Sequence, residues 1–167
     1  MRPEEPFQLY GLKPAFKVDL AAVEARHQKM MLQVHPDRFV DKSPAERRVA
    51  EQWSARFNEA LRLLRDPIAR ASLLCELAGH PVKAETDTHM DPAFLIEQME
   101  RRETLEQAQA AADHAALARL EEEAARRWDA LVAELAEAID GRGDFEAAVE
   151  LVRRLMFERK YMVELEQ

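Results

Sequence analysis

The chain has 167 residues, 47% of them hydrophobic, which suffices for one domain or two small ones with a packed core. Its formal net charge of −8 argues against nonspecific nucleic-acid binding, because that binding depends on cations that neutralise phosphates. The single cysteine, Cys75, excludes an intramolecular disulfide and a Cys-x-x-Cys zinc site, and its apolar neighbours predict a small buried side chain. These properties favour a protein partner.

The sequence shows no membrane or export signal. No segment approaches the 18 or so apolar residues of a transmembrane helix, and the amino terminus lacks the apolar run of a signal peptide. Glu4 and Glu5 also disfavour a basic transit peptide. We therefore expect a cytoplasmic protein that does not contact a membrane.

Helix signals begin near the amino terminus. A short helix is predicted between Pro6 and Gly11, with the glycine as its stop, and Asp19 can cap a second helix that runs to about Val34. The apolar stripe of this second helix includes His27, which is more simply a satisfied core histidine than a metal ligand. Arg26, Lys29 and Gln33 lie on one flank of the stripe, which gives the helix a modestly basic exposed side.

A polar tripeptide, His35-Pro36-Asp37, follows this helix. The residue before a proline is disfavoured in the α region, so His35 should end the helix and lie with Asp37 in an exposed turn. Ser43-Pro44-Ala45-Glu46 is a capping box that starts a third helix to about Arg65. The second and third helices should pair antiparallel, with Trp53, Phe57 and Leu64 on the buried face of the third.

Two further Asp-Pro pairs mark helix starts and divide the chain. Asp66-Pro67 opens a helix that stops at Gly79, and Asp91-Pro92 opens another that runs to about Ala112. Residues 80–90 have no helical period and read as a linker. We therefore predict a first module at 1–79 and a second module at 91–167.

The second module should contain three long helices. Apolar residues from Leu117 to Ile139 recur at spacings of three and four, Gly141-Arg142-Gly143 breaks the pattern, and Asp144 can cap a last helix. Short connections between three helices imply an antiparallel bundle. The predicted fold class is all-α: an N-terminal helical hairpin module followed by a three-helix bundle.

A possible interaction surface lies on the bundle. On the last helix Phe157 falls outside the buried face, and on the 91–112 helix Leu95, Ile96 and Met99 compete with a second stripe that contains Phe94. One hypothesis is a small exposed apolar patch, rimmed by carboxylates at Glu97, Glu100 and Glu103. The alternative is that the first bundle helix is buried on a broad face and that the exposed Phe157 has no role.

Enzymatic chemistry has little support in the sequence. His35 and Asp37 could form an acid–base pair, but a nucleophile, oxyanion donors and a pocket would also be needed. The other histidines have no metal-ligand spacing, no Gly-rich phosphate loop is present, and there are no cysteine pairs for a cluster. We expect no enzyme activity, no cofactor and no bound metal.

The helical frame around His35-Pro36-Asp37, with Phe39 after it and Phe57-Asn58-Glu59-Ala60 on the third helix, resembles the J-domain of co-chaperones over about residues 6–66. Gln33 and Val34 stand where many J-domains have a cation and a tyrosine. The resemblance implies that the loop and its basic flank dock on an ATP-bound chaperone of the DnaK/HscA type and stimulate its ATPase. The implied chaperone-binding residues are His35, Pro36, Asp37, Arg26, Lys29 and Arg38.

A J-domain followed directly by a three-helix bundle resembles HscB, the co-chaperone family of iron–sulfur cluster assembly. The segments from Pro92 to Glu100 and from Arg153 to Phe157 carry this resemblance. It implies that the bundle binds the scaffold protein IscU. The implied scaffold-binding residues are Leu95, Ile96, Met99, Glu100, Glu103 and Phe157.

The sequence is thus interpreted as an adaptor that brings a scaffold protein to an ATP-driven chaperone. Three alternatives stay open at this point. The bundle could bind varied unfolded clients, the patch could serve self-association in a structural oligomer, or His35 and Asp37 could belong to a hydrolase.

Overall fold

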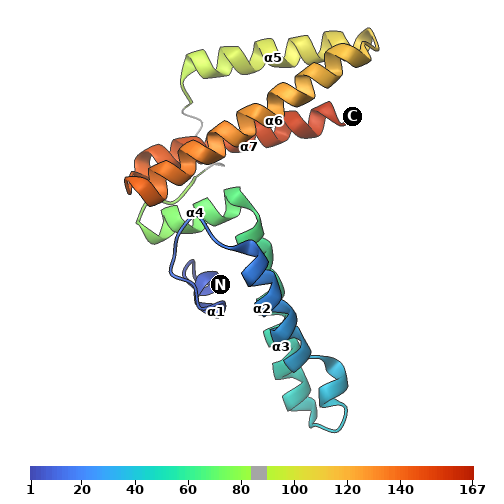
Figure 1. The fold of residues 1–167 in the computed structure, drawn as a ribbon, viewed down its shortest axis with the longest axis vertical. Helices are drawn as coiled ribbons and strands as arrows, with labels where there is room; N and C mark the ends of the chain where they lie inside the picture. Colours follow the sequence, from blue (N-terminus) through green and yellow to red (C-terminus); the bar gives the residue numbers. More distant parts are fainter. Residues whose placement is uncertain (84–89) are drawn as a thin grey trace.

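The computed structural model describes residues 1–83 and 90–167, and all regular structure in these ranges is helical, which confirms the all-α fold class. The elements are α1 (Glu5–Leu9), α2 (Leu20–Gln33), η1 (Pro36–Phe39), α3 (Pro44–Arg65), α4 (Pro67–Leu77), α5 (Pro92–Ala110), α6 (His114–Ala136), η2 (Glu137–Gly141) and α7 (Phe145–Leu165). Figure 1 shows α2 and α3 as an arm that projects away from a layer of three long helices, α5, α6 and α7. No helix in the described ranges is both long and apolar enough to cross a membrane.

Side-chain caps fix most helix starts. Asp19 accepts a hydrogen bond from the Ala22 N–H at 3.1 Å, and Ser43 accepts one from the Glu46 N–H at 3.2 Å. The same type of cap is formed by Asp66 on α4, Asp91 on α5, Asp113 on α6 and Asp144 on α7. Every helix start that the sequence predicted from a capping residue is confirmed.

Two predicted stops are glycines with positive φ. Gly11 has φ +65° after α1, and Gly79 has φ +82° after α4. Side chains with a Cβ rarely adopt this conformation, so the chain can turn sharply at these two positions because they are glycines.

The arm is an antiparallel pair of α2 and α3, and α1 packs against α3 near the base of the arm. Ala60, Leu61 and Leu64 are buried, as the apolar period predicts. The prediction for Trp53 was wrong, because this side chain is 38% exposed. Trp53 lines an open space that it shares with Val34 and Phe39, where α2 ends and η1 passes α3, so the indole is only partly covered.

The bundle has α6 and α7 as its most closely packed pair, with α5 against α6. The two stripes on α5 are resolved: Phe94, Leu105 and Ala108 are buried, whereas the stripe that contains Leu95 and Met99 is exposed. The broad buried face that was the alternative for α5 is therefore not formed.

One hydrophobic core runs through both halves of the molecule. Phe7, Val23 and Leu64 from the first half share a cluster with Leu135 and Val152 from the second. Helix α4 packs against both α3 and α7 and so connects the arm to the bundle. The division at a linker of residues 80–90 stays a prediction, and residues 84–89 of that linker lie outside the described residues.

Candidate functional site

The His35-Pro36-Asp37 loop is held at the free end of the arm. Helix α2 ends at Val34, whose backbone N–H donates to the Met30 carbonyl, and the 3-10 helix η1 begins at Pro36. The His35 Nδ1 accepts the Asp37 N–H at 3.2 Å and lies 3.6 Å from a carboxylate oxygen of Asp37. Because Nδ1 is the acceptor in this bond, the neutral ring carries its proton on Nε2 and can donate there to a partner. Both side chains are exposed.

The cations predicted around the loop are all exposed, but they differ in their contacts. The Arg26 guanidinium donates to the Tyr10 carbonyl, so it also fixes the end of α1. Lys29 and Arg38 form no ion pair with any described residue, which leaves their charges available to a partner.

His27 has a structural environment. The Tyr10 hydroxyl lies 2.8 Å from His27 Nδ1 and donates to the Phe57 carbonyl at 2.9 Å. Since the hydroxyl has one proton, the Nδ1–H of His27 supplies the other bond. Burial, with help from the charge of Arg65, lowers the pKa of His27, and burial raises the pKa of Tyr10 to about 12. These bonds tie α1, α2 and α3 together beneath the loop and confirm a satisfied core histidine.

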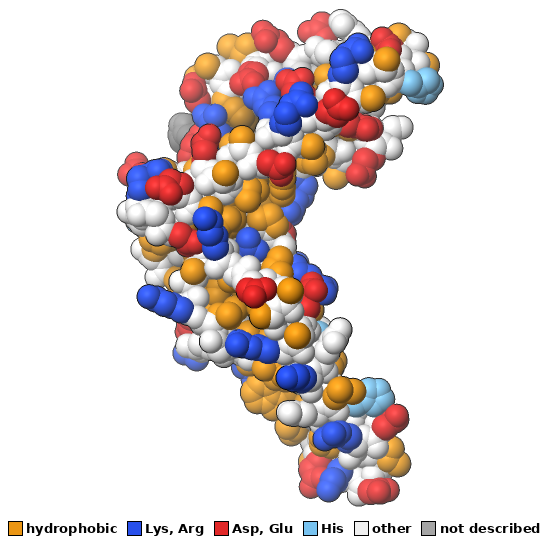
Figure 2. Space-filling model, in the orientation of Figure 1, with side chains coloured by type: hydrophobic (Ala, Val, Ile, Leu, Met, Phe, Trp, Pro, Cys, Tyr) orange, Lys and Arg blue, Asp and Glu red, His pale blue; other side chains and the backbone are white. Residues whose placement is uncertain are grey.

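The apolar side chains predicted on the bundle surface are exposed. We call Leu95, Ile96, Met99 and Phe157 the bundle patch. Met99 is 71% exposed and Phe157 is 36% exposed, and the Phe157 ring packs edge-on against the buried Phe94 at 5.4 Å between centroids. Figure 2 shows hydrophobic side chains among charged ones along the outer side of α5. The predicted exposure of Phe157 is confirmed, and the structure places its ring beside the first turn of α5.

Part of the bundle patch forms a groove between α5 and α7. Leu95, Met99 and Phe157 line a space of about 330 Å³, with the nearly buried Tyr161 beside them. Lys160 and the ion-paired Arg102 and Glu164 also line it. An apolar side chain of a partner would fit between the two helices, with charges at the edge to orient it.

A buried ion pair holds the walls of this groove together. Arg101 on α5 donates to both carboxylate oxygens of Glu158 on α7, at 2.7 and 2.9 Å. Burial alone would lower the pKa of Arg101, but the bonds to Glu158 and its charge raise that pKa overall. The Arg101 guanidinium also lies over the Tyr161 ring, 4.0 Å from its centroid.

The carboxylates predicted at the rim of the patch do not line the groove. Glu97 forms an ion pair with Arg127 on α6, so it stabilises the bundle. Glu100 and Glu103 are exposed on α5 and are open to a partner that approaches from that side.

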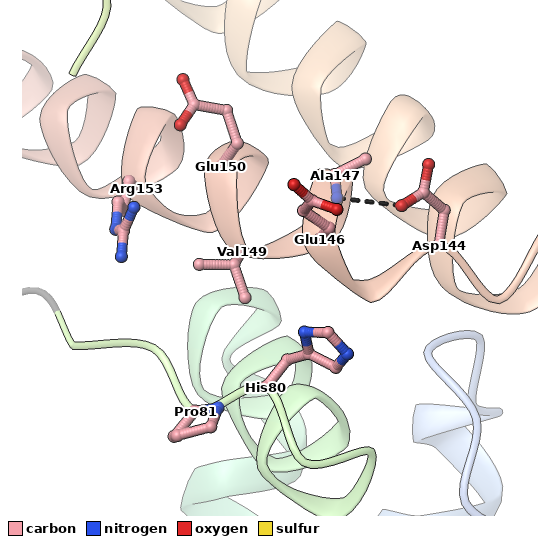
Figure 3. Close-up of a pocket in the computed structure, with 8 residues that line it drawn as sticks. All are labelled: His80, Pro81, Asp144, Glu146, Ala147, Val149, Glu150 and Arg153. Carbon is pink, nitrogen blue, oxygen red and sulfur yellow. Dashed lines mark hydrogen bonds between the residues drawn. The ribbon is translucent and has the colours of Figure 1, made fainter. Parts of the chain in front are cut away.

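A larger cavity lies elsewhere and has no clear chemistry. Figure 3 shows His80 and Pro81 opposite Val149 of α7, in a space of about 620 Å³. Asp144 caps α7 through the Ala147 N–H at 3.1 Å, and the His80 ring stacks on Phe145. This cavity lies between the segment after α4 and the start of α7. Asp144 and His80 in its wall take part in a helix cap and a ring contact, so we assign the cavity no function.

Two residues that connect distant parts of the chain, Asp140 and Arg70, were not identified from the sequence. The Asp140 carboxylate accepts the backbone N–H groups of Phe16 and Lys17 at 2.8 and 2.9 Å, across 124 and 123 residues of chain. Arg70 is buried, and its guanidinium donates to the Phe16 carbonyl at 2.6 Å. No local motif marks either residue, since both act on distant backbone.

Cys75 is fully buried, and burial raises the pKa of its thiol to about 11. The prediction of a small buried side chain is confirmed. Among the described residues, no group of three or more His, Cys, Asp or Glu side chains is arranged to hold a metal ion.

A helical arm with an exposed His-Pro-Asp loop, joined to a three-helix bundle with an open apolar patch, defines a two-part co-chaperone of the J-domain class. The family model described as the HSCB C-terminal oligomerisation domain matches residues 90–166. The co-chaperone protein HscB homolog of Bordetella avium is 48% identical over 165 residues, which cover 99% of this chain and 97% of that protein. The homolog of Bordetella petrii is 46% identical over the same length, covering 99% and 96%.

Solved structures agree with these sequence relatives. Chaperone HscB from Vibrio cholerae matches with a TM-score of 0.85 and 32% identity, covering 99% of this chain and 96% of that chain. Human co-chaperone protein HscB matches with a TM-score of 0.89 and 29% identity, covering 96% and 80%. The chain belongs to the HscB co-chaperone family.

Proposed function

We propose that this protein acts in the cytoplasm as a co-chaperone of iron–sulfur cluster assembly. It delivers an IscU-type scaffold protein to a chaperone of the HscA/DnaK type and stimulates the ATPase of that chaperone, without contact with a membrane or nucleic acid. The observation that supports this proposal most directly is that one chain has two exposed surfaces of different chemistry, the polar loop on the arm and the apolar bundle patch.

The loop and the patch have different tasks in this proposal. The His35 loop, with Arg26, Lys29 and Arg38 around it, binds the ATP-bound conformation of the chaperone more tightly than other conformations and so shifts its equilibrium. Leu95, Ile96, Met99 and Phe157 anchor the scaffold, and Glu100 and Glu103 orient it. Because both partners are held by one molecule, the effective concentration of the scaffold at the chaperone rises.

The decisive experiment measures single-turnover ATP hydrolysis by the chaperone, and scaffold affinity by calorimetry. We expect His35→Gln to abolish the stimulation and leave scaffold affinity unchanged, because the loop is exposed and supports no packing. His114→Gln, the same change at an exposed histidine of the bundle, is the matched control and should change neither measurement.

The reciprocal variant is Met99→Ala. Met99 is 71% exposed, so its truncation should leave stability unchanged and weaken scaffold binding by about tenfold, the scale of an interface anchor. The stimulation of the chaperone ATPase that is measured in the absence of scaffold should persist. Loss of both activities in either variant would contradict two separate surfaces.

Self-association is a second candidate role for the bundle, because the matching family model is described as an oligomerisation domain. Sedimentation at micromolar concentration tests this role. If wild-type protein forms dimers that Met99→Ala dissociates, the patch serves copies of this chain. An unfolded apolar peptide that displaces the scaffold from the patch would instead indicate a general client-binding co-chaperone.

A further inference from the structure

The bundle patch contains a side chain whose redox chemistry the proposed function does not use. Met99 belongs to the patch and, with Leu95 and Phe157, lines the groove between α5 and α7. Its side chain is 71% exposed. A thioether sulfur reacts with peroxides wherever the oxidant can reach it. An oxidisable atom is therefore open to solvent in the middle of an apolar binding surface.

Met99 is the most exposed of the seven methionines of the chain. Five of the others are half-buried or buried: Met30, Met31, Met90, Met156 and Met162. Packing restricts the access of an oxidant to these sulfurs, so they react more slowly than Met99. Met1 is 55% exposed, but it belongs to the first half of the molecule and does not line the groove. Oxidant that enters the groove therefore meets Met99.

Oxidation of Met99 is the transfer of one oxygen atom. The sulfur lone pair attacks an oxygen of hydrogen peroxide, so an S–O bond forms and the O–O bond breaks. The sulfur loses two electrons, and the leaving hydroxide takes the proton of the transferred hydroxyl and becomes water. The product, methionine sulfoxide, is polar where the thioether was apolar. Cys75 does not compete for the oxidant, because it is buried and its thiol pKa is raised to about 11.

The free protein tolerates a sulfoxide at this position. Met99 is not part of the buried core clusters, so water can solvate the new S–O group. The bonds between Arg101 and Glu158, which hold α5 against α7, do not involve Met99. We therefore expect the free energy of unfolding to change little, as for most substitutions at exposed positions.

A partner in the groove reverses this situation. An apolar side chain seated there would cover Met99 together with Leu95 and Phe157 and would remove water from all three. Burial of a polar group without a hydrogen-bond partner is costly, and the sulfoxide would face an apolar surface. Oxidation therefore weakens binding at the patch and leaves the protein folded.

We propose that Met99 is a reversible oxidation site, and that its conversion to the sulfoxide releases the IscU-type scaffold from the bundle patch. This inference rests on the proposed function. The His35 loop lies at the free end of the arm and contains no methionine, so the oxidised protein still stimulates the chaperone in the absence of scaffold (Figure 1). Because the sulfoxide is exposed, a methionine sulfoxide reductase can restore it with a dithiol, which becomes a disulfide while the oxygen leaves as water.

The test uses protein that has been treated with hydrogen peroxide and then freed of it, so that the scaffold never meets the oxidant. Mass spectrometry locates the added oxygen, which Met99 should gain at least about fivefold faster than Met156 or Met162. Calorimetry should show scaffold affinity about tenfold weaker, the scale of a lost interface anchor. Urea denaturation and chaperone stimulation without scaffold should be unchanged, and treatment with the reductase should restore the affinity.

Two variants separate Met99 from the other methionines. Met99→Leu keeps an apolar side chain of similar size that peroxide does not oxidise, and each variant is compared with its own untreated sample. Peroxide should leave the scaffold affinity of Met99→Leu at its untreated value. Met162→Leu is the matched control, because it removes a half-buried methionine of the same bundle and keeps Met99. Its affinity should fall about tenfold after treatment, as in wild type.

The outcomes separate the inference from the function beneath it. Oxidation of Met99 that leaves scaffold affinity unchanged would overturn the inference while the proposed function stands. A loss of affinity in treated Met99→Leu that equals the loss in wild type would assign the effect to another residue and overturn it too. Lower stability of the oxidised protein in urea would indicate damage to the fold and not a switch. If untreated wild type does not bind the scaffold, the proposed function fails, and the inference fails with it.

Discussion

The Arg101–Glu158 ion pair links the two helices whose side chains form the bundle patch. Both side chains are nearly buried, and the two bonds set the register of α5 against α7. Glu158 directly follows Phe157 in the sequence, so the position of that anchor depends on a buried ion pair.

We expect Glu158→Gln to lower the free energy of unfolding by about 3 kcal/mol, because it leaves the Arg101 charge buried without its counter-charge. Urea denaturation measures the loss. The double variant Arg101→Met with Glu158→Leu should recover most of it, since apolar side chains of similar size replace a buried pair at little cost. Glu103→Gln, at an exposed carboxylate of α5, is the control and should change stability little.

For single residues, the sequence predicts the exposure or burial that depends on the periodicity of one helix alone. The exposure of Phe157 follows from its angle relative to Leu155, and the burial of Cys75 follows from its apolar neighbours. The Arg101–Glu158 pair spans 57 residues and depends on how two helices rotate against each other, which no local period shows. The exposure of Trp53 was mispredicted for the same reason, since the period of α3 does not reveal how much of the arm is covered.

At the scale of the elements, Asp66 joins three helices. It ends α3, caps α4 through the Ile68 N–H at 3.0 Å, and accepts hydrogen bonds from the Arg159 guanidinium of α7. Burial works to raise the pKa of Asp66, but Arg159 and the capping N–H groups together hold it below its ordinary value.

Because its pKa is lowered, the contribution of Asp66 to the free energy of unfolding decreases as the solution becomes acidic. The folded state binds the Asp66 proton less tightly than the unfolded state, so the stabilisation is complete above the unfolded pKa of 3.8 and is lost as pH falls below it. Asp66→Asn keeps a capping side chain and removes the charge. We expect it to cost about 1 kcal/mol at pH 7, a modest value because the pair is partly exposed, and the difference from wild type should shrink below about pH 4.

Urea denaturation at pH 7 and at pH 3 measures this difference. Asp66→Ala removes the cap as well and should cost about 1 kcal/mol more than Asp66→Asn at both pH values. A difference between wild type and Asp66→Asn that is the same at pH 3 and pH 7 would show that the charge of Asp66 is not what stabilises the junction.

The helices themselves were predictable because their signals are local. A capping residue followed by proline, as at Ser43, Asp66 and Asp91, specifies a helix start within one turn, and Gly11 and Gly79 specify stops. The cap of Asp66 was therefore visible in the sequence. Its bond to Arg159, 93 residues away, was not.

At the scale of the molecule, the arm and the bundle are fastened at several points. The shared core joins them, α4 packs on α7, and Asp140 holds the segment before α2 through two backbone N–H groups. Arg70 binds the same segment through the Phe16 carbonyl. Such a junction fixes the direction of the arm relative to the bundle, a property that cannot be read from two modules analysed separately.

Asp140→Ala tests whether this fixed direction serves the proposed function. Because the Phe16 and Lys17 N–H groups lose their acceptor, we expect the free energy of unfolding to fall by about 1 to 2 kcal/mol. Asp140 forms no hydrogen bond or ion pair with the His35 loop or the bundle patch among the described residues, so stimulation without scaffold and scaffold affinity should each stay at wild-type values. The extra stimulation produced when scaffold and co-chaperone are added together should decrease, because a loosened junction lowers the effective concentration of one partner at the other.

Single-turnover ATPase with and without scaffold measures that extra stimulation, and Asp129→Ala, at an exposed carboxylate of α6, is the control. Small-angle scattering of the free variant provides the structural measurement, since a freely moving arm broadens the distance distribution of this elongated molecule. If the distribution broadens and the joint stimulation is unchanged, orientation does not matter and tethering alone accounts for delivery. If the distance distribution broadens and the joint stimulation decreases, the hydrogen bonds of Asp140 to Phe16 and Lys17 contribute to delivery of the scaffold as well as to stability.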